Sequence, residues 1–168
     1  MKKRLILFVL CIVLILSFSS CGNKESSEMV TETDEVSENI TAPLRKFHAV
    51  LKPFFDEELL IPTWLPDGFE ESSIDIYNSR FLVNASALYK DTDGKEITIS
   101  VCSTLAGSSP KIEVDEGSVE EYERGGKIYH FATNMGRPKA FWSAGKYYVE
   151  IFGGATKEEL CKMADSAF

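Results

Sequence analysis

The chain has 168 residues, a formal net charge of −8 and four cysteines, and 44% of its residues are hydrophobic. Its acidic balance argues against nucleic acid and anionic lipid headgroups as the main partners, because phosphates would be repelled. The length suits a single domain with a core of its own, preceded by a short N-terminal leader.

Residues 1–20 are typical of a secretory signal peptide. Lys2, Lys3 and Arg4 precede an unbroken apolar run of twelve residues, Leu5 to Leu16, and small residues follow it. That run is too short to cross a bilayer as a helix, which needs about twenty apolar residues. We therefore expect the segment to be removed rather than retained as a membrane anchor.

The cysteine at the end of this segment makes it resemble a bacterial lipoprotein signal, although Phe18 stands where such signals most often have leucine. The resemblance implies that Cys21 becomes the mature N-terminus and carries lipid, such as palmitate, on its sulfur and amino group. Each buried methylene contributes about 0.8 kcal/mol, so two or more chains hold a protein stably on a membrane. The expected location is the extracytoplasmic face of the cell membrane. The alternative is an ordinary secretory signal with a chance cysteine.

Residues 21–43 predict a disordered acidic tether. They contain one lysine against six acidic residues and almost no large apolar side chains. Such a segment cannot bury enough surface to offset the entropy of ordering it. The remaining residues, 44–168, are expected to form a single folded domain.

The domain is predicted to begin with a helix and a turn-rich segment. Thr41 can cap a helix that tolerates Pro43 in its first turn and that ends or kinks at Pro53. Its apolar face recurs at helical spacing and comprises Leu44, Phe47, Val50 and Leu51. Residues 61–69 contain two prolines and Asp67-Gly68, which indicates ordered turns.

Short alternating segments then predict an antiparallel sheet. The expected strands cover residues 73–77, 81–89, 97–102, 119–124, 127–133, 140–143 and 146–152, with a loop over 107–116. Asp93-Gly94, Gly125-Gly126 and Ala144-Gly145 indicate hairpin turns. A final helix begins at the capping box formed by Thr156 and Glu159. The sum is an α+β fold: an antiparallel sheet of about six or seven strands with an N-terminal and a C-terminal helix packed on it.

Several stretches of the domain are similar to a known family. The segments Pro62 to Phe69, Gly94 to Ile99, Trp142 to Tyr148 and Gly153 to Leu160 resemble the bacterial family catalogued as domain of unknown function 4367. The similarity covers roughly residues 58–168. Because members are often lipoproteins or the outer parts of membrane-anchored regulators in Gram-positive bacteria, it implies an extracytoplasmic module in the cell envelope. It supplies no catalytic residues.

The polar residues form no recognisable reactive constellation. His48 and His130 lack a cysteine or carboxylate at metal-ligand spacing, and Asp91 to Glu96 is too short for a calcium loop, so we expect no metal, cofactor or catalytic residue. Cys102 and Cys161 are the only cysteines left for an intramolecular disulfide, and burial as free thiols accounts for them equally well.

Aromatic residues gather in the last strands and lead to a functional hypothesis. They are Tyr129, Phe131, Phe141, Trp142, Tyr147, Tyr148 and Phe152. Core packing and cross-strand pairs explain most of them, and a groove for a small apolar ligand, a peptide or a partner protein is the sharper interpretation. We expect a non-enzymatic, lipid-anchored binding or sensing domain whose partner is an envelope protein or peptide. The alternatives are a scaffold without a ligand and, less favoured, a cell-wall hydrolase with two converging carboxylates.

Overall fold

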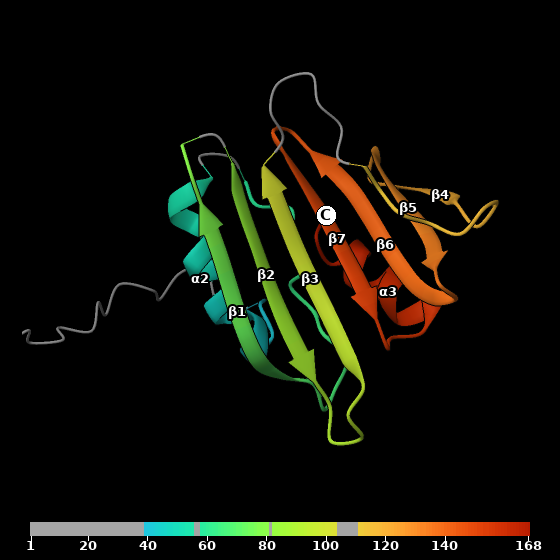
Figure 1. The fold of residues 1–168 in the computed structure, drawn as a ribbon, viewed down its shortest axis with the longest axis horizontal. Coiled ribbons are helices and arrows are strands. Elements are labelled where there is room, and N and C mark those ends of the chain that lie inside the picture. Colours follow the sequence, from blue (N-terminus) through green and yellow to red (C-terminus); the bar gives the residue numbers. More distant parts are fainter. Residues whose placement is uncertain (1–38, 56–57, 81, 104–110) are drawn as a thin grey trace, which may run out of the picture. The chain divides into compact units, whose positions relative to one another are not determined.

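Seven antiparallel strands form one sheet with the order β1-β2-β3-β7-β6-β5-β4 (Figure 1). The structure is a computed structural model that describes residues 39–55, 58–80, 82–103 and 111–168. The predicted signal peptide, Cys21 and most of the predicted tether lie outside the described residues. The strands are β1 (Glu70–Asn78), β2 (Val83–Lys90), β3 (Glu96–Ser103), β4 (Glu120–Arg124), β5 (Lys127–Asn134), β6 (Arg137–Ala144) and β7 (Tyr147–Gly153).

The alternation of apolar residues sets which face each strand buries. Ala85, Ala87 and Tyr89 of β2 are fully buried, and the intervening side chains are not. The same holds for Ile97, Ile99 and Val101 of β3, with Cys102 on the opposite face as predicted. A period of two places alternate side chains on opposite faces, so one face of the sheet carries the main core. We call this the inner face and the opposite one the outer face.

Both helices cover the inner face (Figure 1). The N-terminal one is short: a 3-10 turn, Ala42–Leu44, leads into α2 (Arg45–Leu51), and a second 3-10 turn, Lys52–Phe54, contains Pro53. The predicted apolar face is confirmed, because Leu44, Phe47 and Leu51 are fully buried.

The boundary between tether and domain lies earlier than residue 44. Ile40 is only 8% exposed, and the Thr41 amide donates to the carbonyl of Thr63 at 2.8 Å. Thr41 therefore joins the domain through its backbone, and its side chain makes no cap hydrogen bond to the helix. Residues 40–43, which we assigned to the tether, belong to the folded part because they bury apolar surface and satisfy backbone groups.

The C-terminal helix α3 (Lys157–Asp165) has the predicted capping box. The Glu159 amide donates to Thr156 Oγ1, and the Thr156 amide donates to a carboxylate oxygen of Glu159. Its buried residues include Leu160, Met163 and Ala164, and it packs against β5 and β6. Among the described residues, no helix is both long enough and apolar enough to cross a membrane.

The turn-rich segment 58–66 connects the two helices across the inner face. His48 of α2 donates from Nε2 to the Pro62 carbonyl at 2.8 Å. At the other side, the Thr63 amide donates to Ser166 Oγ at 3.1 Å. Between them, Trp142 Nε1 donates to the Leu60 carbonyl at 2.9 Å. The two proline turns therefore hold an irregular backbone whose polar groups are satisfied by side chains from the sheet and both helices.

Candidate functional site

A second apolar cluster lies on the outer face, away from the two helices. It consists of Ala132, Phe141 and Tyr148, with Ile112 and Val114 packed against it. The three strand residues come from β5, β6 and β7, three neighbouring strands. Their burial on the outer face means that something other than α2 and α3 covers them.

The cover is the segment that precedes β4, residues 111–118. Asp115 fixes this segment to the turn between β5 and β6: its carboxylate accepts hydrogen bonds from Thr133 Oγ1 at 2.7 Å and from the amides of Met135 and Gly136 at 2.8 and 2.9 Å. These bonds, led by the one from Thr133, hold the pKa of Asp115 below its usual range. With Asp115 held in place, Ile112 and Val114 lie against the sheet.

A buried lysine on β6 holds the same segment against the sheet. Lys139 is 3% exposed, and its ammonium donates to the Glu113 carbonyl at 3.0 Å and lies 3.3 Å from a carboxylate oxygen of Glu150. A buried charge is tolerated only where such partners surround it. The outer face of β6 and β7 is therefore built around a charged pair as well as around aromatic rings.

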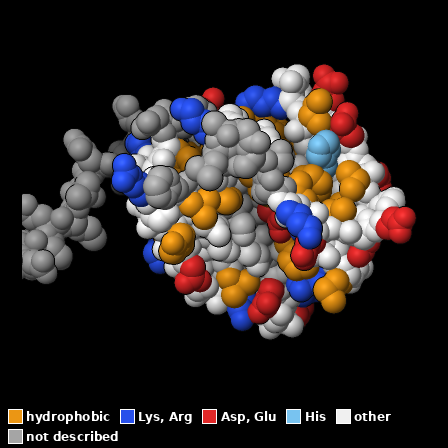
Figure 2. All heavy atoms as spheres, turned by 45° about the horizontal axis from the view of Figure 1, so that its top comes forward, with side chains coloured by type: hydrophobic (Ala, Val, Ile, Leu, Met, Phe, Trp, Pro, Cys, Tyr) orange, Lys and Arg blue, Asp and Glu red, His pale blue; other side chains and the backbone are white. Residues whose placement is uncertain are grey.

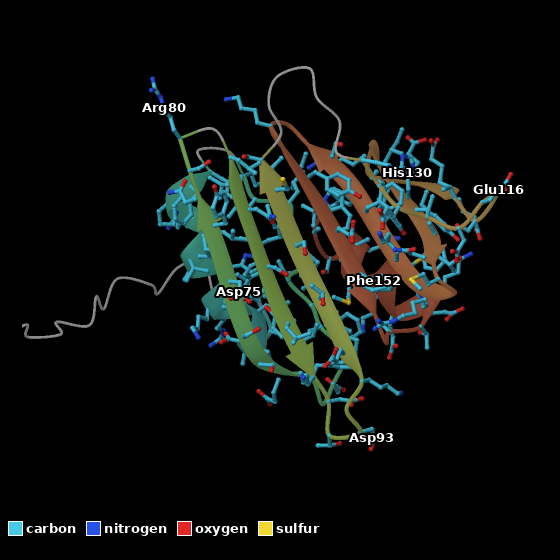
Figure 3. The ribbon with its side chains drawn as sticks, in the orientation of Figure 1. Asp75, Arg80, Asp93, Glu116, His130 and Phe152 are labelled. Atoms are coloured by element: carbon cyan, nitrogen blue, oxygen red, sulfur yellow. The ribbon has the colours of Figure 1, made fainter. Side chains whose placement is uncertain are left out.

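Beside this cluster the surface is hollowed. The hollow has a volume of about 460 Å³ and is lined by Ile112, Gly126, Ile128, His130, Phe141, Trp142, Ser143 and Tyr148. Figure 2 shows hydrophobic side chains gathered around a histidine on this part of the surface, with acidic side chains near the edge. In Figure 3, His130 lies at the β5 side of the sheet, far from Asp75 on β1. The size falls in the range of pockets that hold small ligands or single side chains.

Strand register brings the key lining residues together. His130 pairs with Phe141, and their rings lie edge to face with centroids 5.1 Å apart. Ser143 pairs with Tyr148 on the next strand. The rings of Phe141 and Tyr148 have centroids 6.1 Å apart. Four side chains from three strands thus form one continuous patch on the outer face.

Two polar atoms in this patch lack partners. Tyr148 is 6% exposed, and its hydroxyl has no hydrogen-bond partner among the described residues. His130 Nδ1 is buried and unpartnered in the same way. Burial, followed by the charge of Glu150, raises the pKa of Tyr148, so its phenol is protonated and able to donate and accept. A buried polar group without a partner costs stability, which makes these two atoms candidates for contact with a ligand.

The other residues singled out in the sequence do not join the hollow. Cys102 lies on the outer face of β3 and Cys161 on α3, and both are free thiols. The sheet separates them, so of the two accounts left open by the sequence the structure agrees with free thiols and not with a disulfide. Burial raises the pKa of each thiol. His48 lies on α2, on the other side of the sheet from His130.

Comparison with known proteins identifies the domain. The family model described as "Domain of unknown function (DUF4367)" matches residues 59–166. The chain belongs to this family. The match confirms the resemblance drawn from the proline turns and the last strands, and it spans β1 to β7 and α3. A search of curated proteins gives no match.

Sequence reasoning found the aromatic residues but not the hollow. The alternation of β5 already placed His130 on the same face as Ile128 and Ala132. What the sequence did not show is that Ser143 and Tyr148 pair directly, or that residues 111–118 return to cover the outer face. The aspartate in that segment, followed by Gly117 and Ser118, was a local signal of an ordered turn.

Proposed function

We propose that this is a lipid-anchored cell-envelope protein whose domain binds a ligand or a partner group in the outer-face hollow, without catalysis. One observation carries the binding role: Tyr148 lines the hollow and is only 6% exposed, and its buried hydroxyl has no hydrogen-bond partner among the described residues. The Tyr89 hydroxyl is also buried without a partner in the described part of the chain but lies in the main core, whereas Tyr148 borders a hollow in which a ligand atom could complete its hydrogen bonding.

A binding role suits the lining better than a reaction does. Nucleophilic catalysis needs a nucleophile and a base within hydrogen-bond reach of each other. Ser143 and His130 both line the hollow, but no hydrogen bond joins them in the described part of the chain, and His130 Nδ1 has no partner. Three carboxylates pair with lining residues in the sheet register: Glu150 lies 3.3 Å from the Lys139 ammonium, and Glu121 and Glu123 are exposed on the edge strand β4.

The envelope location rests on the N-terminal sequence. A basic start, a short apolar run and Cys21 are together typical of a lipoprotein signal. Two or more acyl chains on Cys21 would hold the domain on the membrane, and the acidic segment after it would give the domain reach. Metabolic labelling with a palmitate analogue tests this directly. The wild-type chain should incorporate label and fractionate with membranes, and Cys21→Ser should do neither. Labelling of the serine variant would refute the assignment of the anchor.

Site-specific crosslinking in intact cells tests the binding role. A photoreactive amino acid at Ser143 should give discrete crosslinked products, because this residue is exposed at the hollow. The matched control is Ser73, an exposed serine on the outer face of β1 at the other edge of the sheet. Equal product patterns at both positions, or none at Ser143, would contradict a binding role for the hollow.

A further inference from the structure

We propose that the hollow accepts a primary ammonium group carried on a short apolar body. The inference rests on the proposed function, since it names the chemistry of the group that occupies the same hollow. Its three supports are the hydrogen-bonding atoms of the lining, the apolar surface between them and the charges at the rim.

The polar atoms of the lining can all act as acceptors. Tyr148 Oη and Ser143 Oγ each offer lone pairs, and His130 Nδ1 accepts when the ring proton is on Nε2. An ammonium group carries three donors and no acceptor, so it can satisfy three such atoms at once. A carboxylate offers only acceptors and could use the hydroxyl protons of Tyr148 and Ser143, so the charges around the hollow decide between the two groups.

The remaining lining suits an apolar body next to the cation. Ile112, Ile128 and the ring of Phe141 provide an apolar wall. The Phe141 and Tyr148 rings are 6.1 Å apart, and aromatic rings attract cations through the negative potential of their faces. Trp142 contributes no indole donor to the hollow, because its Nε1 is hydrogen-bonded to Leu60 on the inner face. Aliphatic or aromatic carbon attached to the ammonium would fill the space that the acceptors leave.

Charged side chains near the hollow favour a positively charged ligand. On β4, Glu121 pairs with His130 and Glu123 with Ile128, and both carboxylates are exposed at the edge of the sheet. Lys111, which is exposed next to Ile112, adds one positive charge, and the Glu150 carboxylate beside Phe141 is offset by the Lys139 ammonium 3.3 Å away. Two carboxylates on the β4 side attract an ammonium and repel a carboxylate, with a strength that salt reduces.

A ligand series that changes only the polar head tests this inference. The probes are 2-phenylethylammonium, 3-phenylpropionate and 2-phenylethanol, with a blocked Ala-Lys-Ala peptide as a second source of the ammonium. Affinity is measured by ligand-observed NMR titration of the full chain in a neutral detergent. Fluorotyrosine labelling reports the site, because the chain has six tyrosines and Tyr→Phe variants assign their signals. We expect 2-phenylethylammonium to bind about tenfold more tightly than 3-phenylpropionate and to shift the Tyr148 signal.

Variants separate the contribution of the Tyr148 hydroxyl to binding from that of the β4 carboxylates. Tyr148→Phe removes one acceptor and should weaken the binding of 2-phenylethylammonium about tenfold, since hydrogen bonds to charged groups are the stronger kind. Tyr89→Phe is the matched control: Tyr89 is also buried, and its hydroxyl has no partner in the described part of the chain, but it lies on the inner face. It should leave binding unchanged. The Glu121→Gln, Glu123→Gln double variant should weaken binding a few-fold and remove most of its dependence on salt.

The outcomes distinguish this inference from the function on which it rests. Binding of 3-phenylpropionate or 2-phenylethanol at Tyr148 with equal or higher affinity would overturn the ammonium assignment and leave the hollow as a binding site. Binding of the lysine peptide but not of 2-phenylethylammonium would support the ammonium and assign it to a peptide. If none of the probes shifts the Tyr148 signal, the ammonium inference is wrong, and the crosslinking experiment at Ser143 then decides whether the hollow binds anything.

Discussion

Replacing Tyr148 with phenylalanine should stabilise the ligand-free protein. The substitution keeps the ring that packs against Phe141 and Ala132 and removes only the hydroxyl, which is buried and has no partner among the described residues. Leaving a buried polar group unsatisfied costs about 1–3 kcal/mol, and we expect the variant to recover about 1 kcal/mol of that. For a domain of this size, a gain of about 1 kcal/mol raises Tm by roughly 3–5 °C.

Thermal and urea unfolding of ligand-free protein measure this gain, and two further variants calibrate it. Tyr89→Phe should also stabilise, because its hydroxyl is buried and unpartnered in the main core. Tyr147→Phe should destabilise by about 1–3 kcal/mol, because the Tyr147 hydroxyl donates to the Glu58 carbonyl at 2.8 Å and accepts from the Leu60 amide. If Tyr148→Phe loses about 1 kcal/mol or more, its hydroxyl is satisfied in the free protein. The argument that it awaits a ligand would then fail.

Three further predictions concern stability. Burial lowers the pKa of His48 in the folded state, so the unfolded chain binds more protons below the ordinary histidine pKa of about 6.5. The free energy of unfolding should therefore fall as the pH drops through this range. His48→Gln should flatten that slope in urea titrations from about pH 7 to 5. Met135 has φ +54° and precedes Gly136 in a two-residue hairpin turn. Met135→Asn should therefore raise the free energy of unfolding by about 0.5–1 kcal/mol, and Met135→Val should lower it. A change of the same sign in both variants would contradict a left-handed turn. Thr156→Ala removes the side-chain cap of α3 and should cost about 1 kcal/mol by thermal unfolding, whereas Thr156→Ser should cost little.

The sequence predicted most of the fold because its elements follow local rules. The alternation in Ala85 to Tyr89 and in Ile97 to Val101 gave β2, β3 and their buried face correctly. Turn residues marked the hairpins, and the pairing of Thr156 with Glu159 marked the start of α3. Each of these signals depends on residues only a few positions apart, which is why it can be read without tertiary structure.

What could not be predicted depends on strand order. Nothing in the sequence shows that β3 pairs with β7 and that β4 lies at the far edge of the sheet. The predicted hairpin joined β6 to β7, but its turn was placed one residue too early, at Ala144-Gly145, so it did not give the pairing of Ser143 with Tyr148. The neighbourhood of His130 and Phe141 required knowing that β5 lies next to β6. The choice between a disulfide and free thiols stayed open for the same reason, because two cysteines can be assigned to opposite faces of a sheet only when the placement of α3 is known.

Strand order also accounts for the presence of the hollow. The chain leaves β3 in the middle of the sheet and must reach β4 at the edge, which requires it to pass β7, β6 and β5. The inner face of these strands is occupied by α3 and by the segment that binds Trp142 and Tyr147. The described part of the connection, residues 111–118, accordingly lies on the outer face, where Ile112 and Val114 cover Phe141 and Tyr148. A covered aromatic patch beside a half-buried histidine is a consequence of this path. A variant that shortens the connection should therefore lose the hollow before it loses the main core.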